Sequence, residues 1–443
     1  MKRVIYLTAM LGAGLISTSS FAQQVSDSVI PKASLQDCIQ YALTHQPVVK
    51  QSLIDQEIAE HTIKSKLADW YPQLNLAAGL NHYLKLQTSY FNGAAITTGV
   101  ANTSSAAFTL TQNIFNRDVL LASKTAKVVR QQAAQNTTSS QIDVVSNVSK
   151  AYYDMLLTKA QVAVLDEDIV RLERSLKDAY NQYQSGIVDK TDYKRATISL
   201  NNAKAQKKTG EESLKAKNAL LKQYMGFPPD SALDVRYDTI QMAQNIQLDT
   251  NTTVAYQNRI EYQLLQTQRS LLEAELRYNK WSYLPTVSAS GSYTFAYFNK
   301  DFGKLYNNNY PNSLVGLTVS LPIFQGFKRT HNIKIAELNL KRTDWDVESL
   351  KQQINTQYTQ AMASYKSNLN EYFVMQENVG LAKEVFNLID LQYREGIKTY
   401  LEVITAQTDL RSAELNYYNA MYTVLSSKID LEVALGTLTP SIQ

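Results

Sequence analysis

The side chains that most often carry catalysis or bind metals are few in this sequence. It contains one cysteine, Cys38, and four histidines spread along 443 residues. One thiol excludes a disulfide framework and a cysteine-based zinc site, and no HExxH, P-loop or GxSxG motif occurs. Cys38 is not preceded by the small residues of a lipid-attachment site, so we expect it to be buried. We predict no enzyme, no cofactor and no metal, and ordinary polar positions for His45, His61, His82 and His331.

The composition excludes two further classes of protein. There are 44 Lys and Arg residues against 40 Asp and Glu, a net charge of +4 that offers no basic field for nucleic acid. Apolar residues make up 44% and charged residues 19%, which is unlike a disordered chain. Tyrosine is abundant, with 28 residues. Its ring is apolar and its hydroxyl is polar, so we expect many sites where an aromatic ring packs on apolar groups while its hydroxyl meets water.

The first residues have the pattern of a secretory signal peptide. Lys2 and Arg3 precede a mostly apolar stretch, and a small-x-small cleavage sequence stands at 20–22. We predict cleavage after Ala22, so that residues 1–22 are removed. The mature chain then keeps 42 basic and 40 acidic side chains, a net charge of +2. A membrane helix is the less favoured alternative, because the apolar run is too short to span a bilayer.

The sequence contains an internal repeat of roughly 210 residues. Ile114-Phe115 recurs as Ile323-Phe324, and Gly186-Ile187 recurs as Gly396-Ile397. The predicted elements follow the same order in both halves: helix, strand, strand, long helix, helix. The chain is therefore interpreted as a tandem duplication.

Each repeat has its own predicted boundaries. The first repeat, 23–226, contains a helix 33–70, strands 72–88 and 104–115, a long helix 117–184 and a helix 189–225. A linker, 227–250, joins it to the second repeat. The second repeat, 251–438, contains a helix 251–282, strands 285–298 and 313–322, a long helix 327–393 and a helix 399–435.

The two long helices predict an extended shape. Apolar residues follow alternating spacings of three and four from Val162 to Tyr183, and the same pattern recurs from Tyr372 to Tyr393. This alternation is typical of a coiled-coil seam. The stretch 117–184 contains neither Gly nor Pro, so as one helix it would be ~100 Å long. A helix of that length must lie along other helices, in a barrel or a bundle.

The predicted strands alternate between apolar side chains and small or polar ones. Leu74, Leu76 and Leu80 share one face of the first strand, and Val315 and Leu317 share one face of the last. With aromatic residues at the strand ends, this pattern is typical of a transmembrane β-barrel, although an ordinary half-buried sheet alternates in the same way. Four strands cannot close a barrel. Two chains would give eight strands and three would give twelve; three is preferred if the lumen must be open.

Taken in order, these features resemble the TolC family of outer-membrane efflux proteins. The resemblance rests on the signal peptide, the duplicated unit, Pro72 and Pro285 at helix-to-strand junctions, and the terminal Leu431-x-x-x-Leu435-Gly436. It implies a mixed α+β membrane protein, in which a homotrimeric 12-stranded β-barrel, four strands per chain, continues into a long periplasmic α-helical barrel of coiled coils. It also implies an exit channel in the outer membrane of a Gram-negative bacterium. Its partners would be outer-membrane lipid, a periplasmic adaptor (membrane fusion) protein and an inner-membrane pump of a tripartite efflux or type I secretion system.

The resemblance also implies roles for residues near the ends of the long helices. The chain-reversing tips would meet the adaptor through Ser185, Gly186, Ile187, Glu395, Gly396 and Ile397. Glu402 corresponds to the first acidic position of a ring in the closed constriction. Thr405 replaces the second, which predicts a weaker ring. The polar links that hold the family's tips shut correspond to Thr191, Asp192, Tyr393 and Lys398. The family has Arg at the last position, so we expect a looser link from Lys.

Plainer interpretations stay open at each of these sites. Glu402 could be a solvated surface residue, Tyr393 a packing residue, and the two tip glycines mere turn-formers. A trimeric coiled-coil protein with a structural or adhesive role in the envelope would explain the helical seams without the strands. A pump-independent porin is a further alternative. The sequence does not indicate which substrate is transported.

Overall fold

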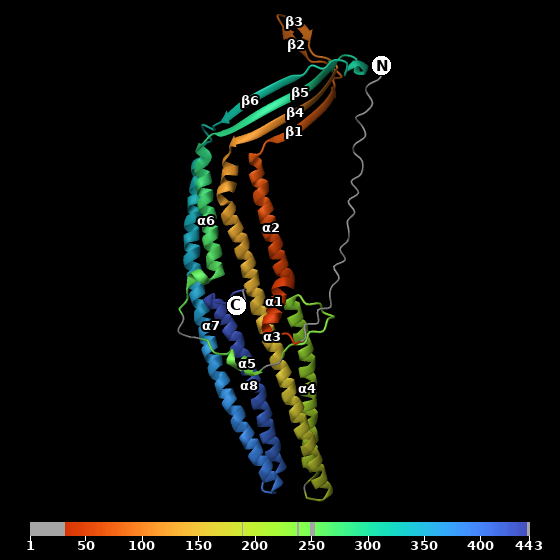
Figure 1. Cartoon of the computed structure of the whole chain (residues 1–443), viewed down its shortest axis with the longest axis vertical. Helices are drawn as coiled ribbons and strands as arrows, with labels where there is room; N and C mark the ends of the chain where they lie inside the picture. The colour runs from red at the N-terminus through yellow and green to blue at the C-terminus, as the bar shows by residue number, and fades with distance from the viewer. Residues whose placement is uncertain (1–31, 188, 237–238, 249–252, 441–443) are drawn as a thin grey trace.

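The protein is elongated, with a β-sheet at one end and two helical hairpin tips at the other (Figure 1). A computed structural model describes residues 32–187, 189–236, 239–248 and 253–440. The predicted signal peptide lies outside the described residues. Two long helices, α3 (Arg117–Gln184) and α7 (Lys328–Arg394), run from the sheet to the tips.

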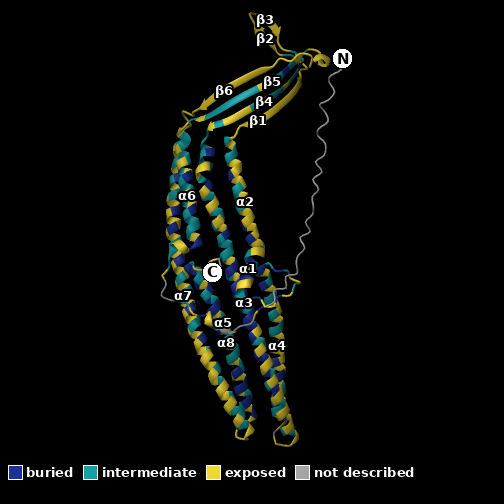
Figure 2. Ribbon diagram, viewed as in Figure 1, coloured by how far each residue is buried: buried dark blue, intermediate teal, exposed yellow. Residues whose placement is uncertain are grey.

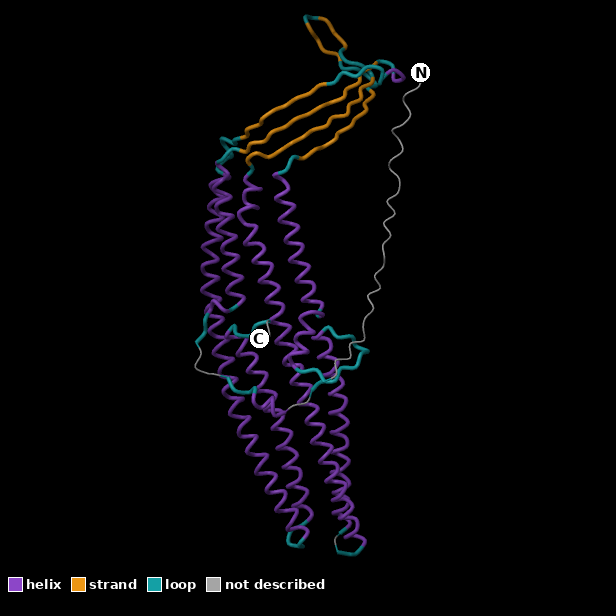
Figure 3. Tube along the Cα trace, viewed as in Figure 1, coloured by secondary structure: helices purple, strands orange, loops and turns teal. Residues whose placement is uncertain are grey.

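Shorter helices lie beside each half of the long ones (Figure 3). Next to the sheet these are α2 (Pro47–Leu67) and α6 (Ile260–Lys280), and next to the tips they are α4 (Lys190–Met225) and α8 (Tyr400–Leu435). Helix α3 packs on α2, α4, α6 and α8, whereas α7 packs on α6 and α8. Among the described residues, no helix combines the length and the apolar character needed to cross a membrane.

Strands from both repeats form one antiparallel sheet. Its order is β1 (Gln73–His82), β4 (Asn102–Phe115), β5 (Thr286–Asn299), β6 (Asn312–Ser320). The repeats meet where β4 pairs with β5, and the register shifts once, between Asn113 and Phe115. Strands β1 and β6 are the edges of this sheet, and within the described chain neither is paired on its outer side.

The strand register gives the sheet one apolar face and one polar face. Leu76, Phe108 and Tyr293 lie in one row across three strands, and the next row along is small or polar. On the edge strands the apolar side chains are exposed, up to 89% for Val315, and Figure 2 shows both β1 and β6 as exposed. The alternation in the sequence therefore produces one continuous apolar face.

The predicted strand 72–88 is wrong at its far end. Strand β1 ends at His82, and a separate hairpin follows, formed by β2 (Thr88–Phe91) and β3 (Ala94–Thr97). Its turn is Asn92-Gly93, with φ of 49° and 79°. Two positive φ values are what a tight hairpin turn of this kind needs. The hairpin lies beyond the end of the main sheet (Figure 1).

The predicted helices 33–70 and 251–282 are also corrected by the structure. The first is two helices, α1 (Leu35–His45) and α2, with a break at Gln46, whose ψ is 124°. Pro47 causes the break, because it disfavours a helical conformation in the residue before it. In the second repeat, a short 3₁₀ turn at Tyr256–Asn258 comes first and α6 begins only at Ile260.

The other helices agree closely with the predicted boundaries. Helix α3 has the predicted ends, and α4, α7 and α8 each differ by one residue at one or both ends. Asn116 caps α3 with its side chain, as Asp189 caps α4. The linker contains a short helix, α5 (Thr239–Gln244), that was not predicted.

The main core lies at the middle of the molecule, where the linker and α1 pack on α3, α4, α7 and α8. Tyr365 is fully buried there and donates a hydrogen bond of 2.8 Å to the carbonyl of Ile246. Cys38 is fully buried in the same core, as predicted. Two glycines end the flanking helices with a left-handed conformation, Gly226 after α4 and Gly436 after α8. We refer to this cluster of buried residues as the equatorial core.

Candidate functional site

The two hairpin tips are built alike. Gly186 (φ 71°) and Gly396 (φ 77°) each reverse the chain after a long helix. In the first tip the amide of Ile187 bonds to the carbonyl of Gln182 at 2.9 Å, and Ile397 makes the equivalent bond of 2.8 Å in the second. This arrangement satisfies helix-end carbonyls at a glycine cap. Ile187 is 73% exposed and Ile397 is 70% exposed, so each tip presents one apolar side chain.

Glu402 has a structural role at the start of α8. Its carboxylate accepts hydrogen bonds from the Thr399 amide at 2.9 Å and the Thr399 hydroxyl at 3.0 Å, which completes a capping box. Its other oxygen accepts a bond of 2.6 Å from Lys398. The Lys398 hydrogen bond and then the Thr399 bonds lower the pKa of Glu402 to about 2. The carboxylate is therefore held ionised within its own hairpin.

Two predicted site residues are placed by these contacts. Lys398, expected to link the hairpins, pairs instead with Glu402 in the same hairpin. Thr405 is exposed and lies one turn after Glu402. Its hydroxyl donates a hydrogen bond of 2.8 Å to the carbonyl of Leu401. Glu402 and Thr405 thus share one face of α8, three residues apart.

A hydrogen bond joins the two hairpins near their tips. The Tyr393 hydroxyl donates to Oε1 of Gln182 at 2.9 Å, from α7 to α3. Burial raises the pKa of Tyr393, and the nearby charge of Asp192 adds to that rise. Gln182 was not predicted. We call this hydrogen bond the tip link.

The remaining predicted gate residues lie beside the tip link without forming it. The amide of Thr191 bonds to the Asp189 carboxylate at 3.4 Å, as part of the cap of α4. Tyr400, also not predicted, is buried against Ala179 and Ala196. Its hydroxyl has no hydrogen-bond partner in the described part of the chain. Tyr400 thus packs the start of α8 against both α3 and α4 through its ring.

A second polar contact joins α3 to α8 farther from the tips. Asp168 is fully buried, accepting bonds from Gln407 Nε2 at 2.9 Å and Arg411 Nη1 at 3.1 Å. Arg171 Nη2 lies 3.7 Å from Asp168 and 3.6 Å from Glu414. Burial raises the pKa of Glu414. We call these five residues the charged clasp.

The charged clasp was not predicted, because the spacing of apolar residues does not mark its polar members. Its α8 members, at 407, 411 and 414, follow the same spacing of four and three as a seam, but with polar side chains. Polar residues at seam spacing are therefore the signal in the sequence that points to this contact. Asp168 stands immediately before the seam residue Ile169. A charged residue beside a seam is usually interpreted as solvent-exposed, so its burial was not expected.

The two proline junctions next to the sheet are equivalent. A 3₁₀ turn leads to Pro72 in the first repeat and to Pro285 in the second, and the residue before each proline is extended, with ψ of 154° and 147°. Proline favours an extended residue before it. Strands β1 and β5 start directly afterwards.

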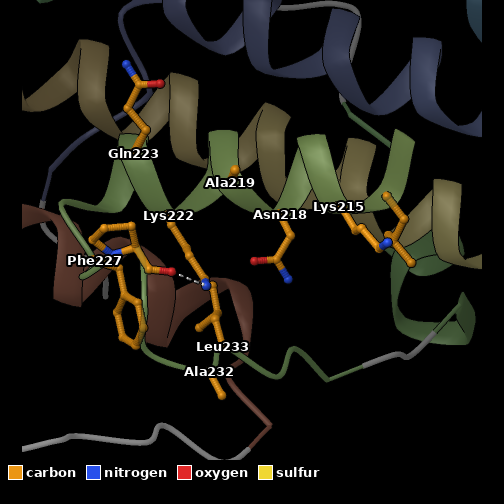
Figure 4. Close-up of a pocket in the computed structure, with 10 residues that line it drawn as sticks. Lys215, Asn218, Ala219, Lys222, Gln223, Phe227, Ala232 and Leu233 are labelled. Carbon is orange, nitrogen blue, oxygen red and sulfur yellow. Dashed lines mark hydrogen bonds between the residues drawn. The ribbon is translucent and has the colours of Figure 1, made fainter. Parts of the chain in front are cut away.

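A pocket of about 700 Å³ lies between α4 and the linker, far from the tips. Figure 4 shows Lys222 donating a hydrogen bond of 3.0 Å to the Pro229 carbonyl within it. The lining holds two lysines but no acidic side chain or histidine, so it offers no acid–base pair. In the described residues, no group of three or more His, Cys, Asp or Glu side chains could hold a metal.

A family model described as outer membrane efflux protein matches residues 38–227 and 253–437. The chain belongs to this family. The two matched ranges correspond to the two repeats, which confirms the duplication. The chain is 24% identical to outer membrane protein TolC of Escherichia coli K12, over 98% of this chain and 86% of the relative. It is 21% identical to the cation efflux system protein CusC of the same organism, over 66% of this chain and 64% of the relative.

Solved structures of outer membrane channels have the same fold. VceC of Vibrio cholerae superposes with a TM-score of 0.73 at 15% identity, covering 91% of this chain and 96% of that one. The open state of the MtrE channel of Neisseria gonorrhoeae gives 0.72 at 17% identity, covering 92% and 90%. The fold class predicted from the sequence is confirmed, with four strands of a mixed α+β chain continuous with long paired helices.

Family membership settles the broad function and place of the protein. It is an efflux channel protein of the outer membrane, as the sequence resemblance implied. The family is one of channels and transport proteins and is not a family of enzymes.

Proposed function

We propose that the protein is the exit duct of a tripartite system, through which an inner-membrane pump and a periplasmic adaptor pass substrates out of the cell. The observation that carries this proposal is continuity: α3 and α7 run unbroken from the membrane-type sheet to the exposed tips. At ~1.5 Å per residue, each helix is ~100 Å long. One molecule therefore reaches from the outer membrane deep into the periplasm.

The open edges of the sheet support a homotrimer. Strands β1 and β6 each leave one side unpaired within the described chain, and lipid cannot satisfy such backbone groups. Three copies would pair each β6 with the next β1 and close a barrel of twelve strands, with the apolar row of Leu76, Phe108 and Tyr293 toward lipid. The polar face would then line an open lumen.

The helices carry a matching surface for a second copy. Val374, Leu381, Val385 and Leu388 lie on one face of α7 at spacings of seven, four and three, and each is 42–54% exposed in the single chain. Such a stripe is the seam of a coiled coil. A neighbouring protomer in the trimer would cover it.

The tips are the proposed contact with the adaptor. They pair an exposed apolar residue, Ile187 or Ile397, with the turn residues around it: Ser185, Gly186, Glu395 and Gly396. In a trimer the six exposed isoleucines would lie together at one end of the helical barrel, where they would form an apolar surface that a partner could cover. Helical hairpins of an adaptor would dock onto these two positions.

The gate is proposed to lie directly above the tips. Three copies of Glu402 would form an acidic ring that favours cations, with Thr405 in the neighbouring ring one turn away. The tip link from Tyr393 to Gln182, with Asp192, Thr191 and Lys398 beside it, would hold the closed state. Opening would break the tip link first.

An export assay tests this function. Deleting the gene should sensitise the host to substrates of the cognate pump, and the wild-type gene should restore resistance. The variant carrying Ile187→Asp and Ile397→Asp should reach the outer membrane as a heat-stable trimer and fail to restore export. Full export by that variant would exclude the tips as the adaptor contact. A host unaffected by the deletion would exclude the exit-duct function.

A further inference from the structure

The charged clasp occupies a defined level between the tips and the equatorial core. Measured along α3, Asp168 lies ~22 Å from Tyr183 at the tip. Leu157, the α3 residue of the equatorial core nearest the tips, lies ~39 Å from the same point. The clasp therefore ties α3 to α8 in the stretch where the large core has already ended.

The clasp is difficult to open. Both oxygens of Asp168 are bonded to α8, by Gln407 and by Arg411, and the side chain is fully buried. Separating the two helices at this level would break both of these hydrogen bonds and part the Asp168 carboxylate from the Arg411 guanidinium, which is unfavourable. Arg171 adds a positive charge within 3.7 Å of Asp168.

The polar contact nearer the tips is weaker than the clasp. On the tip side of the clasp, the described residues form one hydrogen bond between the hairpins, which is the tip link. It joins two neutral groups, the Tyr393 hydroxyl and the Gln182 amide. Breaking it leaves no unpaired charge, and Gln182 is close enough to solvent to bond to water instead. The two contacts therefore differ in kind.

We propose that Asp168 is the positioning residue of the gate, holding α3 and α8 together as the pivot about which the hairpins part. Movement is then confined to the stretch between the clasp and the tips, and the lever is ~22 Å long. Without the clasp the lever would extend to the equatorial core, ~39 Å, so the same angle would move the tips ~1.7-fold farther. The proposal rests on the gate proposed above, because a pivot requires tips that open.

Single-channel conductance in planar bilayers tests the pivot, since only assembled channels are counted. The starting point is a tip variant, Asp192→Ala with Tyr393→Phe, which should conduct more than the wild type. Adding Asp168→Asn, which keeps the side-chain size and removes the charge, should raise the conductance a further ~1.7-fold or more, in line with the longer lever.

Two further variants keep the test decisive. Gln407→Met removes one hydrogen bond to Asp168 and no charge, so it should give part of the same rise, even where Asp168→Asn does not assemble. Gln161→Met is the matched control, because Gln161 bonds Asn419 at 2.7 Å between the same two helices but on the core side of the clasp. It should add nothing.

The outcomes separate the pivot from the gate. A tip variant that conducts like the wild type would overturn the proposed gate and the pivot with it. A tip variant that conducts more, with no further rise from Asp168→Asn or Gln407→Met, would overturn the pivot and leave the gate standing. An equal rise from Gln161→Met would also overturn it, because any bond between α3 and α8 would then have the same effect.

Discussion

Two polar contacts between the hairpins of this protein lie at different levels and differ greatly in strength. At the tip link, one neutral hydrogen bond between Tyr393 and Gln182 connects partly buried side chains. At the charged clasp, a fully buried Asp168 is held by two groups of α8. A neutral hydrogen bond contributes about 1 kcal/mol, whereas removing one partner of a buried charge pair costs about 3–5 kcal/mol.

This difference shows how one continuous coiled coil can be both a rigid duct and a gate. The seam of apolar residues runs past both levels with the same spacing, so apolar packing does not distinguish them. The polar contacts do. A gate needs a contact that opens at low cost, whereas a rigid channel wall needs one that does not. Along α3, the tip link lies about 21 Å beyond the clasp.

The largest expected effect is on stability at the clasp. Asp168→Ala leaves Arg411 without its carboxylate and should lower the free energy of unfolding by about 3–5 kcal/mol. Tyr393→Phe at the tip link should lower it by about 1 kcal/mol. Thermal or denaturant unfolding of the purified protein, followed by circular dichroism, measures both. Equal losses would remove the distinction between the two contacts.

Glycine substitutions provide a second comparison between the tips and the middle of the molecule. Gly226 has φ of 66°, and an added Cβ would lie 2.9 Å from the backbone of Gln46, so Gly226→Ala should cost about 2–5 kcal/mol. Gly186 has φ of 71° and open space around it, so Gly186→Ala should cost about 1–2 kcal/mol. Melting temperatures rank the two, and the reverse order would contradict the described packing.

The tip variant is expected to change conductance with little loss of stability. Asp192→Ala with Tyr393→Phe removes the tip link and one acidic neighbour, so closed channels should conduct more in planar bilayers. Their unfolding free energy should fall by only about 1 kcal/mol. A large loss of stability without a gain in conductance would show that the tip link stabilises the fold and does not keep the channel closed.

The smallest expected effect concerns the charge of Glu402. A lowered pKa means that the carboxylate stays ionised above that value and loses its charge only as the pH falls through about 2. Cation selectivity, measured as the reversal potential in a salt gradient, should therefore hold steady from about pH 7 to about pH 4.

Two controls define the role of Glu402. Glu402→Gln should reduce the selectivity, and Thr405→Val, on the same face but uncharged, should leave it unchanged. Selectivity that is unaffected by Glu402→Gln would place the selective charge elsewhere. Selectivity that titrates near the ordinary pKa of a glutamate, 4.5, would show that Lys398 and Thr399 do not hold the carboxylate.

The sequence predicted the long elements because their signals are local. Helix α3 starts after a capping Asn116 and ends before Gly186, and both residues are legible as helix boundaries. Pro47 is an equally local signal for a break, because proline disfavours a helical conformation in the residue before it, yet the predicted helix 33–70 runs through it. Asn92-Gly93 is likewise a local signal for a tight hairpin turn, but no hairpin was predicted there because the apolar alternation before it favoured one long strand.

The side-chain partners were harder to predict because they depend on how the hairpins pack. Tyr393 was predicted to be a gate residue, but its partner, Gln182, was not among the predicted residues. Lys398 was expected to cross between hairpins and instead pairs with Glu402 four residues away. Asp168 and Arg411 stand 243 residues apart, and only the packing of α8 on α3 brings them together.

The central claim, that the hairpins part at the tips while the clasp holds, is tested most directly by a distance measurement. Spin labels at Ser185 and Glu395 report the tips, and labels at Val170 and Asp409 report the level of the clasp; all four side chains are exposed in the single chain. Cys38 is replaced by alanine, and labelled protomers are diluted with unlabelled ones so that distances within one protomer are read. On introducing Asp192→Ala with Tyr393→Phe, the tip distance should lengthen and the clasp distance should stay the same. Equal lengthening at both levels would contradict the account.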